Sequence, residues 1–364
     1  MPAAKTGVDV IFGCDTRLAD QAKGARLAKP TIHDVAEKAG VSIKTVSRVI
    51  NNEPNVKMST RIRVARAVAK LGYHPDPSAR RLASNRSYIL GLLYDNPSAS
   101  YVINIQTGVL KVCQKEGFDL LIHPCNYKDP GLIKNIKTFR DHSKLDGMIL
   151  TPPLSDVGAL IKFLQQEKVP HMRIAPADNI DDGRCVLTND LEACREMIRY
   201  LISLGHTRIG FIVGHPDHRA VMNRYEGFLE GLAEAGLKVD KELLAQGYNS
   251  FESGIECARK LLGLKHPPTA IFASNDDMAA GVMLVAHEMQ LDIPGQLSVA
   301  GFDDIPLAQQ LWPSLTTIQQ PIETMAMRAT ELLIAQLRDI SAETAAHVIT
   351  SKMIIRDSTA PAPG

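Results

Sequence analysis

The chain has 364 residues, of which 45% are hydrophobic and 22% are charged, and its formal net charge is +1. This composition is that of an ordinary globular protein with room for two or three domains. It excludes a fibrous or intrinsically disordered chain. No stretch approaches the roughly eighteen uncharged residues of a membrane helix, and the first 29 residues lack the order of a secretory signal, so we expect a cytoplasmic protein.

The cysteines are scattered along the chain, without a C-x-x-C pair and without the Cys and His spacing of a zinc site. Because most of them have apolar neighbours, we expect buried free thiols. No motif predicts a metal or a cofactor. The six residues are Cys14, Cys113, Cys125, Cys185, Cys194 and Cys257.

Basic residues are concentrated near the N-terminus. Residues 29–86 hold twelve Lys and Arg against four Asp and Glu, a net charge of +8, whereas residues 87–364 carry a net charge of −8. A basic segment attached to an acidic body predicts a module that binds a polyanion, joined to a second module with another task.

Three helices are predicted after a flexible leader, residues 1–29. The first begins at Thr31 and ends at Gly40, and the second is capped by Ser42 and runs to about residue 51. The third covers residues 59–71 and ends at Gly72. Its apolar spacing predicts a buried stripe made of Ile62, Ala65 and Val68 or Ala69.

The first two helices have a helix-turn-helix pattern. Ala36 stands where two helices approach closely, Gly40 falls in the turn, and Val46 and Val49 fall in the small core. The remaining residues form an outer face of the kind that enters a DNA major groove, where Lys and Arg donate to guanine. This face holds Ser42, Ile43, Lys44, Ser47 and Arg48, and phosphate attraction would come from Arg61, Arg63, Arg66 and Lys70.

A short segment, YHPDPSARRLASNRS, separates these helices from the body. It predicts a helix of about two turns with Pro77 at its first position, within a linker over residues 76–86. Such a short helix is marginal in isolation.

Beyond residue 87 the pattern alternates between strand and helix. It predicts parallel sheets with helical crossovers, hence a doubly wound α/β body of two lobes with a cleft between them. The strands are expected over 88–94, 119–125, 146–153, 171–175, 185–190, 208–214, 243–248, 269–276 and 298–304. The helices are expected over 100–117, 130–143, 155–168, 191–204, 219–235, 252–263 and 277–289.

Several motifs resemble one family closely. TIHDVAEKAGVSIKTVSRVINNEPNV, FIVGHPDHRAVMNRYEGF, TAIFASNDDMAAG, SVAGFDD and PSLTTIQQP make residues 30 to 357 similar to the lactose-repressor (galactose/purine-repressor) family. The resemblance implies a transcriptional regulator, usually a repressor, that binds a near-palindromic operator as a dimer and has no enzymatic activity. It also implies a small-molecule effector in the cleft of a body that resembles periplasmic binding proteins.

The resemblance implies the following domains. Residues 30–75 form an all-α helix-turn-helix module, residues 76–86 a hinge, and residues 87–358 a two-lobed α/β body with parallel sheets, followed by a tail at 359–364. The first lobe would comprise residues 87–188 and 320–346. The second would comprise residues 189–318 and 347–358.

The resemblance also assigns DNA contacts residue by residue. Leu82, in the hinge, is the side chain that would wedge into a minor-groove step and kink the DNA. The other contacts are Thr31, Ser42, Ile43, Lys44, Thr45, Ser47, Arg48, Asn51, Asn55 and Thr60.

Candidate effector contacts stand at predicted strand ends, where open α/β sheets bind ligands. They are Asn275, Asp303, Arg224, Tyr101 and Asp95. Such side chains suit a polyhydroxylated ligand, so we expect a sugar. One of the family's known sugar binders has an aspartate where this chain has Ala175, and an aromatic residue where this chain has Asn249. Phe251 or Tyr248 would have to replace that aromatic ring.

Other interpretations of these residues stay open in the sequence. Asp276 and Asp304 fit helix caps better than ligands, Arg224 also fits a salt bridge between lobes, and Trp312 also fits a plug at the joint between them. The chain ends without a leucine-heptad tail, which predicts a dimer.

No hydrolase, zinc or nucleotide-binding motif is present in the sequence. A periplasmic binding protein and a nonspecific nucleoid protein are the rival classes. The basic module in front of the body opposes the first of these, and the large sensing body opposes the second.

Overall fold

The computed structural model describes residues 30–50, 55–73, 86–177, 183–218, 220–339 and 347–363. The chain divides into two compact units, Met1–Asn85 and Arg86–Gly364. The predicted leader and the predicted hinge helix, including Leu82, lie outside the described residues, as does Asn51.

The first unit contains three helices, at the predicted places: α1 (Ile32–Ala39), α2 (Ile43–Ile50) and α3 (Met58–Leu71). Gly40 ends α1 with φ 61° and Gly72 ends α3 with φ 60°, a left-handed conformation that glycine adopts without steric cost. Ser42 caps α2, because its Oγ accepts the backbone N–H of Thr45 at 3.2 Å.

The core of the first unit confirms the predicted helix-turn-helix packing and corrects one stripe. Val46 is fully buried and Ala36 nearly so, with Val49 packed against them. On α3, however, the buried residues are Val64 and Ala67, while the predicted stripe residue Ile62 is exposed. Of the predicted stripe, Val68 packs against the core, whereas Ile62 and Ala65 are exposed, because the position of α1 decides which side of α3 is covered.

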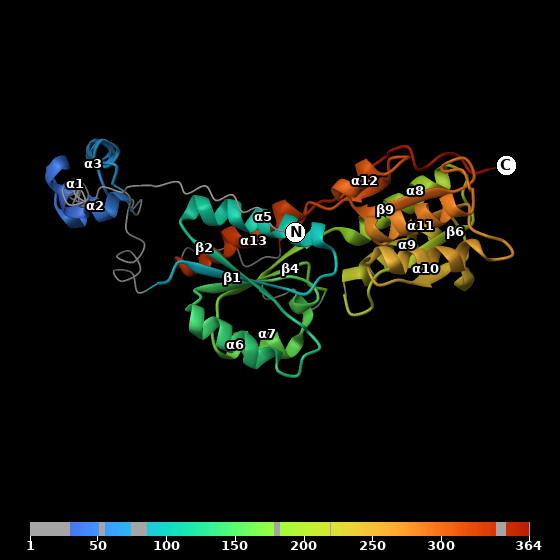
Figure 1. The fold of residues 1–364 in the computed structure, drawn as a ribbon, viewed down its shortest axis with the longest axis horizontal. Helices are drawn as coiled ribbons and strands as arrows, with labels where there is room; N and C mark the ends of the chain where they lie inside the picture. The colour runs from blue at the N-terminus through green and yellow to red at the C-terminus, as the bar shows by residue number, and fades with distance from the viewer. Residues whose placement is uncertain are drawn as a thin grey trace, which may run out of the picture. The chain divides into compact units, whose positions relative to one another are not determined.

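The body consists of two lobes, each built on a six-stranded sheet (Figure 1). All strands of the first sheet run parallel. In spatial order they are β11 (His347–Ile349), β5 (Cys185–Thr188), β4 (His171–Ile174), β3 (Gly147–Leu150), β1 (Ile89–Tyr94) and β2 (Asp119–Pro124).

The second sheet is parallel except for its last strand, which pairs antiparallel with β10. In spatial order its strands are β12 (Lys352–Ile354), β10 (Thr316–Gln319), β9 (Ser298–Asp303), β8 (Ala270–Ala273), β6 (Ile209–Val213) and β7 (Leu244–Gln246). The predicted doubly wound architecture is therefore correct in both lobes.

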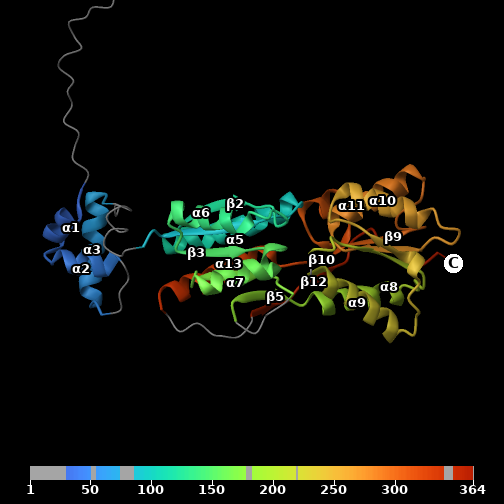
Figure 2. The ribbon, with the colours of Figure 1, turned by 90° about the horizontal axis from the view of Figure 1, so that it is seen from below.

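Helices cover both faces of each sheet (Figures 1 and 2). In the first lobe α5 (Ala99–Glu116) and α13 (Ile322–Leu337) share one core, and α6 (Leu132–Ser143) and α7 (Gly158–Gln166) share another with the short η1 (Leu154–Asp156). In the second lobe one core holds α8 (Asp190–Ser203) and α9 (Ala220–Glu234), and the other holds α10 (Phe251–Leu262), α11 (Asp276–Glu288) and α12 (Pro306–Gln310). A short η3 (Lys241–Leu243) precedes β7.

The chain passes between the lobes three times, near residues 189, 320 and 350. Two of these crossings are tied together, because the Ser351 N–H donates to Asn189 Oδ1 at 2.7 Å. The predicted return to the second lobe at residue 347 is too early: β11 still pairs with β5 in the first lobe, and the chain crosses only after Ile349. Short strands at such crossings carry too little sequence pattern to assign to one sheet.

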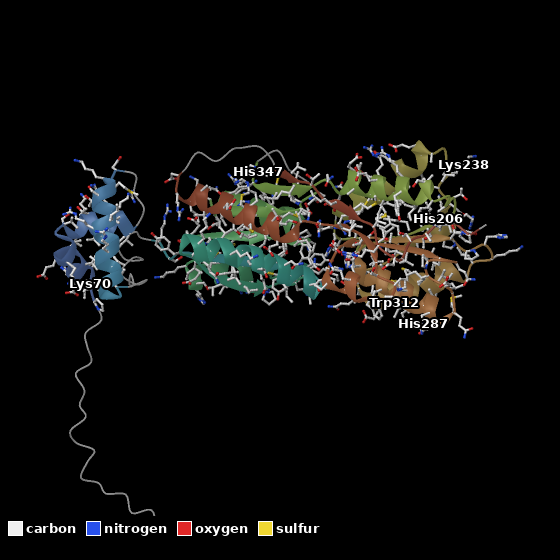
Figure 3. The ribbon with its side chains drawn as sticks, turned by 90° about the horizontal axis from the view of Figure 1, so that it is seen from above. Lys70, His206, Lys238, His287, Trp312 and His347 are labelled. Carbon is white, nitrogen blue, oxygen red and sulfur yellow. The ribbon has the colours of Figure 1, made fainter. Side chains whose placement is uncertain are left out.

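Two further expectations have different outcomes. The five described cysteines form no disulfide bonds, and four of them are buried, as predicted. Trp312, labelled in Figure 3, is 93% exposed and therefore does not fill the joint between the lobes.

Within the described ranges, no helix is long and apolar enough to cross a membrane.

Candidate functional site

The predicted DNA-binding face is displayed on α2. Ile43, Lys44 and Arg48 are exposed, and Ser47 is half-buried. The Ser42 and Thr45 hydroxyl oxygens lie 2.9 Å apart at the start of the helix. Small hydroxyl groups and long cations therefore share the N-terminal part of one helix, which is the part that reads base edges in helix-turn-helix proteins.

Thr31 and Asp34 form a capping box at the start of α1. Asp34 Oδ2 accepts the Thr31 backbone N–H at 2.6 Å and the Thr31 hydroxyl at 2.8 Å. The backbone hydrogen bond from Thr31 lowers the pKa of Asp34. Of the other two predicted contacts that the structure describes, Asn55 precedes α3 and is exposed, and Thr60 lies in the first turn of α3 and is half-buried.

The basic residues of α3 fall into two groups. Arg61 Nε donates to the Val56 carbonyl at 3.3 Å, on the segment that leads in from α2. Arg63, Arg66 and Lys70 instead line a hollow against the end of α1. The four residues therefore do not act as one phosphate-binding row.

In the body, a pocket lies between the two lobes and takes residues from both of them. Four of the five predicted effector contacts line it: Tyr101, Arg224, Asn275 and Asp303. Ala175 and Asn249, the two positions that depart from the family's sugar binders, also line it. The remaining lining residues are Asn96, Ser98, Pro152, His218, Val221 and Gln320.

Asp303, at the end of β9, supplies an unused acceptor. It is 9% exposed, and its Oδ1 makes no hydrogen bond within the described residues, since the nearest cation, Arg224 Nη2, is 3.6 Å away. Burial raises the pKa of Asp303 to about 7, although Arg224 opposes this shift. A buried carboxylate without a hydrogen-bond donor is expensive, and a ligand that donates would relieve this cost.

Arg224 holds the pocket wall together through several neighbours in the second lobe. Its Nε donates to Asp190 Oδ2 at 3.0 Å, its Nη1 donates to the Ser274 carbonyl, and its guanidinium lies 3.6 Å from the ring centre of Phe302. Burial favours its neutral form, but Asp190 and Asp303 outweigh burial and raise the pKa of Arg224. Since both acids belong to the second lobe, a salt bridge between lobes is excluded for Arg224.

Amide groups form the adjoining wall. Asn275 caps α11, with its Oδ1 accepting the Met278 N–H at 3.0 Å and its Nδ2 donating to the Asn249 carbonyl at 3.1 Å. Asn249 Oδ1 accepts the His215 N–H at 3.1 Å. Beside them, burial lowers the pKa of His218 to about 4, so its ring is neutral at pH 7.

Asp95 is the predicted effector contact that the structure places elsewhere. Its Oδ2 accepts the Tyr127 N–H at 2.9 Å, and it does not line the pocket. The acid stands one residue beyond β1, and the loop after the strand turns its side chain toward residue 127. Phe251 and Tyr248, the proposed aromatic replacements, are also absent from the lining and are partly exposed.

Side chains bridge the lobes beside the pocket. Ser98 Oγ donates to Asp277 Oδ2 at 3.0 Å. Asp217, from the second lobe, accepts from the Tyr127 hydroxyl and pairs with Lys128 Nζ at 3.0 Å. These contacts join the two lobes beside the pocket.

The acid neighbours Asp276 and Asp304 are structural, but they are not the predicted caps. Asp276 lies inside α11 and accepts from the Thr317 hydroxyl at 2.6 Å and from the Ile305 N–H at 2.9 Å. Asp304 accepts from Arg356 Nη2 at 2.6 Å. The sequence could not separate a cap from a buried acceptor, because the partners come from distant segments of the chain.

Gln320 is a pocket residue that the sequence analysis missed. It is 6% exposed, follows β10 at a lobe crossing, and its Oε1 has no hydrogen-bond partner among the described residues. Its backbone N–H donates to the Asp303 carbonyl, which brings the two side chains to the same wall. The strand-end rule that selected Asp303 would also have selected Gln320 if β10 had been recognised.

Comparisons with known proteins agree over most of the chain. Residues 31–76 match the family "Bacterial regulatory proteins, lacI family", and residues 198–359 match a periplasmic binding protein-like domain. The transcriptional repressor CytR of Escherichia coli is 32% identical over 92% of this chain and 97% of its own length. The regulator GalR of Escherichia coli is 34% identical over 84% of this chain and 88% of its own length.

A solved complex of the transcriptional regulator CelR with cellobiose covers 90% of this chain and 99% of its own, with a TM-score of 0.70 and 27% identity. The lac repressor dimer bound to operator superimposes with a TM-score of 0.70 at 24% identity, which shows the shared fold. Full-length similarity, a helix-turn-helix unit and two periplasmic-binding-protein-like lobes agree with one another, and the chain belongs to the lacI family of bacterial DNA-binding transcriptional regulators.

Proposed function

We propose that this regulator is a repressor that binds a near-palindromic operator as a dimer and is controlled by a neutral polyhydroxylated ligand in the interlobe pocket. The observation that carries the proposal is a buried wall, at Asp303 and Gln320, with two acceptor oxygens that receive no hydrogen bond from the residues the structure describes. A small molecule with several hydrogen-bond donors would supply the hydrogen bonds that these oxygens lack.

The DNA-binding part of the proposal rests on α2. Lys44 and Arg48 would donate to guanine, and Ile43 would contact a thymine methyl group. Thr31, Ser42, Thr45, Ser47, Asn51, Asn55 and Thr60 would contact bases or phosphates around it. Leu82 would wedge into the minor groove at the centre of the operator, so Leu82→Ala should weaken specific binding more than nonspecific binding.

The ligand class follows from the charges around the pocket. The positive charge of Arg224 is already matched by the buried carboxylates of Asp190 and Asp303, so the pocket lining offers no surplus positive charge to an anionic ligand. The Asp303 carboxylate would repel a carboxylate or phosphate, whereas two neighbouring hydroxyl groups could donate to Asp303 and Gln320. A neutral sugar fits this demand better than a sugar acid or a sugar phosphate, and cellobiose in the CelR complex is a neutral sugar.

The dimer would form through the outer edge of the first lobe. β2 is the last strand of its sheet, and Leu121 and Ile122 on it are 37% and 40% exposed. On the neighbouring helix α5, Ile103 and Leu110 are exposed as well. An edge strand with exposed apolar residues is a surface that proteins normally cover.

Control would act through the angle between the lobes. The proposed ligand would contact both lobes. It would favour one arrangement of the lobes only if it binds that arrangement more tightly than the other. A change of about 1.4 kcal/mol in that balance alters operator affinity tenfold. The sign of the response is set by which arrangement holds the hinge segments of the two subunits together. The protein would have no catalytic role and would act in the cytoplasm, where the chromosome is.

A binding titration tests the proposal. The purified protein is titrated, at physiological salt, against DNA from upstream of its own coding sequence and against random fragments, with and without sugars. The panel contains each neutral sugar beside its uronic acid and its phosphate ester. We expect nanomolar selective binding that one neutral sugar changes at least tenfold, with no response to its charged forms. Equal affinity for all fragments, or a response only to an anionic sugar, contradicts the proposal.

Two variants separate the two halves of the proposal. Arg48→Ala should lose operator selectivity and still bind the sugar, whereas Asp303→Asn should bind the operator normally and respond weakly to the sugar. A variant that loses both properties would indicate misfolding, which circular dichroism detects independently.

A further inference from the structure

The first unit carries a basic hollow that the recognition helix does not use. We call it the basic groove, and it is lined by Lys38, Ala39, Arg63, Arg66, Ala67 and Lys70. The cavity measures about 210 Å³. Its floor is formed by the two alanines, both buried, and its walls are the four exposed cations.

The charges of the basic groove are not neutralised by the protein. Within the described part of the chain, none of the four cations forms an ion pair with a carboxylate. The helix α1 carries two acids, Asp34 and Glu37, and within the described residues neither pairs with a cation of the groove, so four positive charges outweigh two negative ones here. Four like charges around one concavity repel one another, so an anion that fills the hollow gains their summed attraction.

The basic groove opens on a different flank from the recognition helix. At about 100° per residue, Arg63, Arg66 and Lys70 lie within about 60° of one another on α3, and Arg61 lies about 160° from Arg63. Arg61 is the side chain that contacts the segment leading in from α2, through the Val56 carbonyl. The groove cations therefore project from the flank of α3 that faces away from that segment.

The position of Lys38 on α1 indicates the same flank for the basic groove. Lys38 lies about 160° around α1 from Ala36. The Ala36 carbonyl accepts the Val41 N–H in the turn that leads to α2. Lys70, labelled in Figure 3, lies on the outer surface of this unit. One straight duplex in contact with the exposed face of α2 would therefore not also fill the groove.

The spacing of the cations suits a row of phosphates. Arg63 and Lys70 are seven residues apart, which is about 10 Å along a helix. That length corresponds to about three nucleotides of one DNA strand, at about 3.4 Å per nucleotide. The Arg side chains can bind phosphate oxygens in a bidentate manner, and Lys can bind them as a point charge.

We propose that the basic groove binds the phosphodiester backbone of a second DNA segment, so that each helix-turn-helix unit holds one duplex through α2 and another through α1 and α3. The second contact is independent of sequence. It would allow the protein to bring together two DNA segments, or to hold DNA that bends back around the unit. This inference needs only the DNA-binding family of the chain, and not the effector proposal.

A two-duplex capture experiment tests the proposal. The full-length protein is saturated with an immobilised duplex from its upstream region, and a labelled 20-base-pair duplex of unrelated sequence is added at about 50 mM salt. We compare the wild type with a triple variant, Arg63→Gln, Arg66→Gln and Lys70→Gln. The control is a triple variant with the same charge loss on exposed lysines of the body, Lys134→Gln, Lys137→Gln and Lys162→Gln.

We expect the wild type and the body control to capture the second duplex, and the groove variant to capture it at least tenfold more weakly. The slope of log K against log salt for this capture should fall by about 3 in the groove variant, about one for each cation removed. Affinity for the immobilised duplex should change less than threefold, which also shows that the variant is folded.

Three results would overturn the proposal. The first is equal capture of the second duplex by the groove variant and the wild type. The second is a parallel loss of both duplexes, which would place the groove in the same contact as α2. The third is capture of a labelled poly-glutamate peptide in preference to the second duplex, which would assign the groove to an acidic protein. If no duplex is bound in the first step, the DNA-binding assignment itself fails, and that failure is visible separately.

Discussion

The state of Asp303 predicts a pH dependence of effector binding. Burial raises the pKa of Asp303 to about 7, and the ligand hydroxyls are expected to donate to its ionised form. Ionised Asp303 is about 90% of the population at pH 8 and about 9% at pH 6, so affinity should fall about tenfold over this range, which is about 1.4 kcal/mol. Below pH 6 the loss continues at about tenfold per unit, until the pKa of the complex is reached.

Three groups that face Asp303 keep one charge state between pH 6 and pH 8, so they do not account for the same profile. Arg224 stays charged, because its acid partners raise its pKa. Burial raises the pKa of Tyr101 above its usual value, and His218, with its pKa lowered to about 4, is already neutral. Two further acids, Asp190 and Asp277, add negative charge near Asp303 and raise its pKa.

The assay is isothermal titration of the active sugar from pH 5.5 to 8.5, in buffers of different ionisation enthalpy. Proton release on binding should be largest below pH 7 and vanish above pH 8. Asp303→Asn should bind more weakly at pH 8 and show a flat profile. A flat profile in the wild type, or an equally steep one in Asp303→Asn, refutes the reasoning.

The same carboxyl group predicts a stability change. Its folded pKa is raised above the usual 3.8, so its contribution to stability is complete below about pH 4 and is lost as the pH rises through about 7. Asp303→Asn should therefore raise the melting temperature of the ligand-free protein, relative to the wild type, more at pH 8 than at pH 5. Thermal scans at the two pH values measure this, and an equal effect at both would contradict the raised pKa.

Three other perturbations follow from the geometry. Arg48→Ala should reduce discrimination between operator and random DNA by about 1–3 kcal/mol, without changing sugar affinity, as gel-shift and calorimetric titrations would show. Gly254→Ala places a Cβ 2.4 Å from the Met278 carbonyl oxygen, so it should lower the free energy of unfolding by about 1–3 kcal/mol, whereas Gly158→Ala, with nothing within 4 Å, should be neutral. Leu121→Glu should convert the dimer into monomers in light scattering; a dimer that persists would move the interface elsewhere.

Local signals in the sequence determined the order of the helices and strands and several of the pocket residues. Caps and glycines at Thr31, Gly40, Ser42 and Gly72 set the ends of the first helices, because these residues act on backbone groups within a few positions. Strand runs of buried apolar residues identified two parallel sheets. Asn275 and Asp303 were found in the same way, because parallel strands present their ends to a ligand.

The tertiary structure decided what depends on partners distant in the sequence. The buried stripe of α3 is set by where α1 lies, Asp276 became a buried acceptor because Thr317 and Ile305 face it, and Asp95 turned to the backbone of Tyr127. Gln320 entered the pocket because the chain crosses between lobes beside Asp303. The sequence specifies which side chains can donate, accept or pack; which of them meet is fixed only when distant segments are brought together by a shared core.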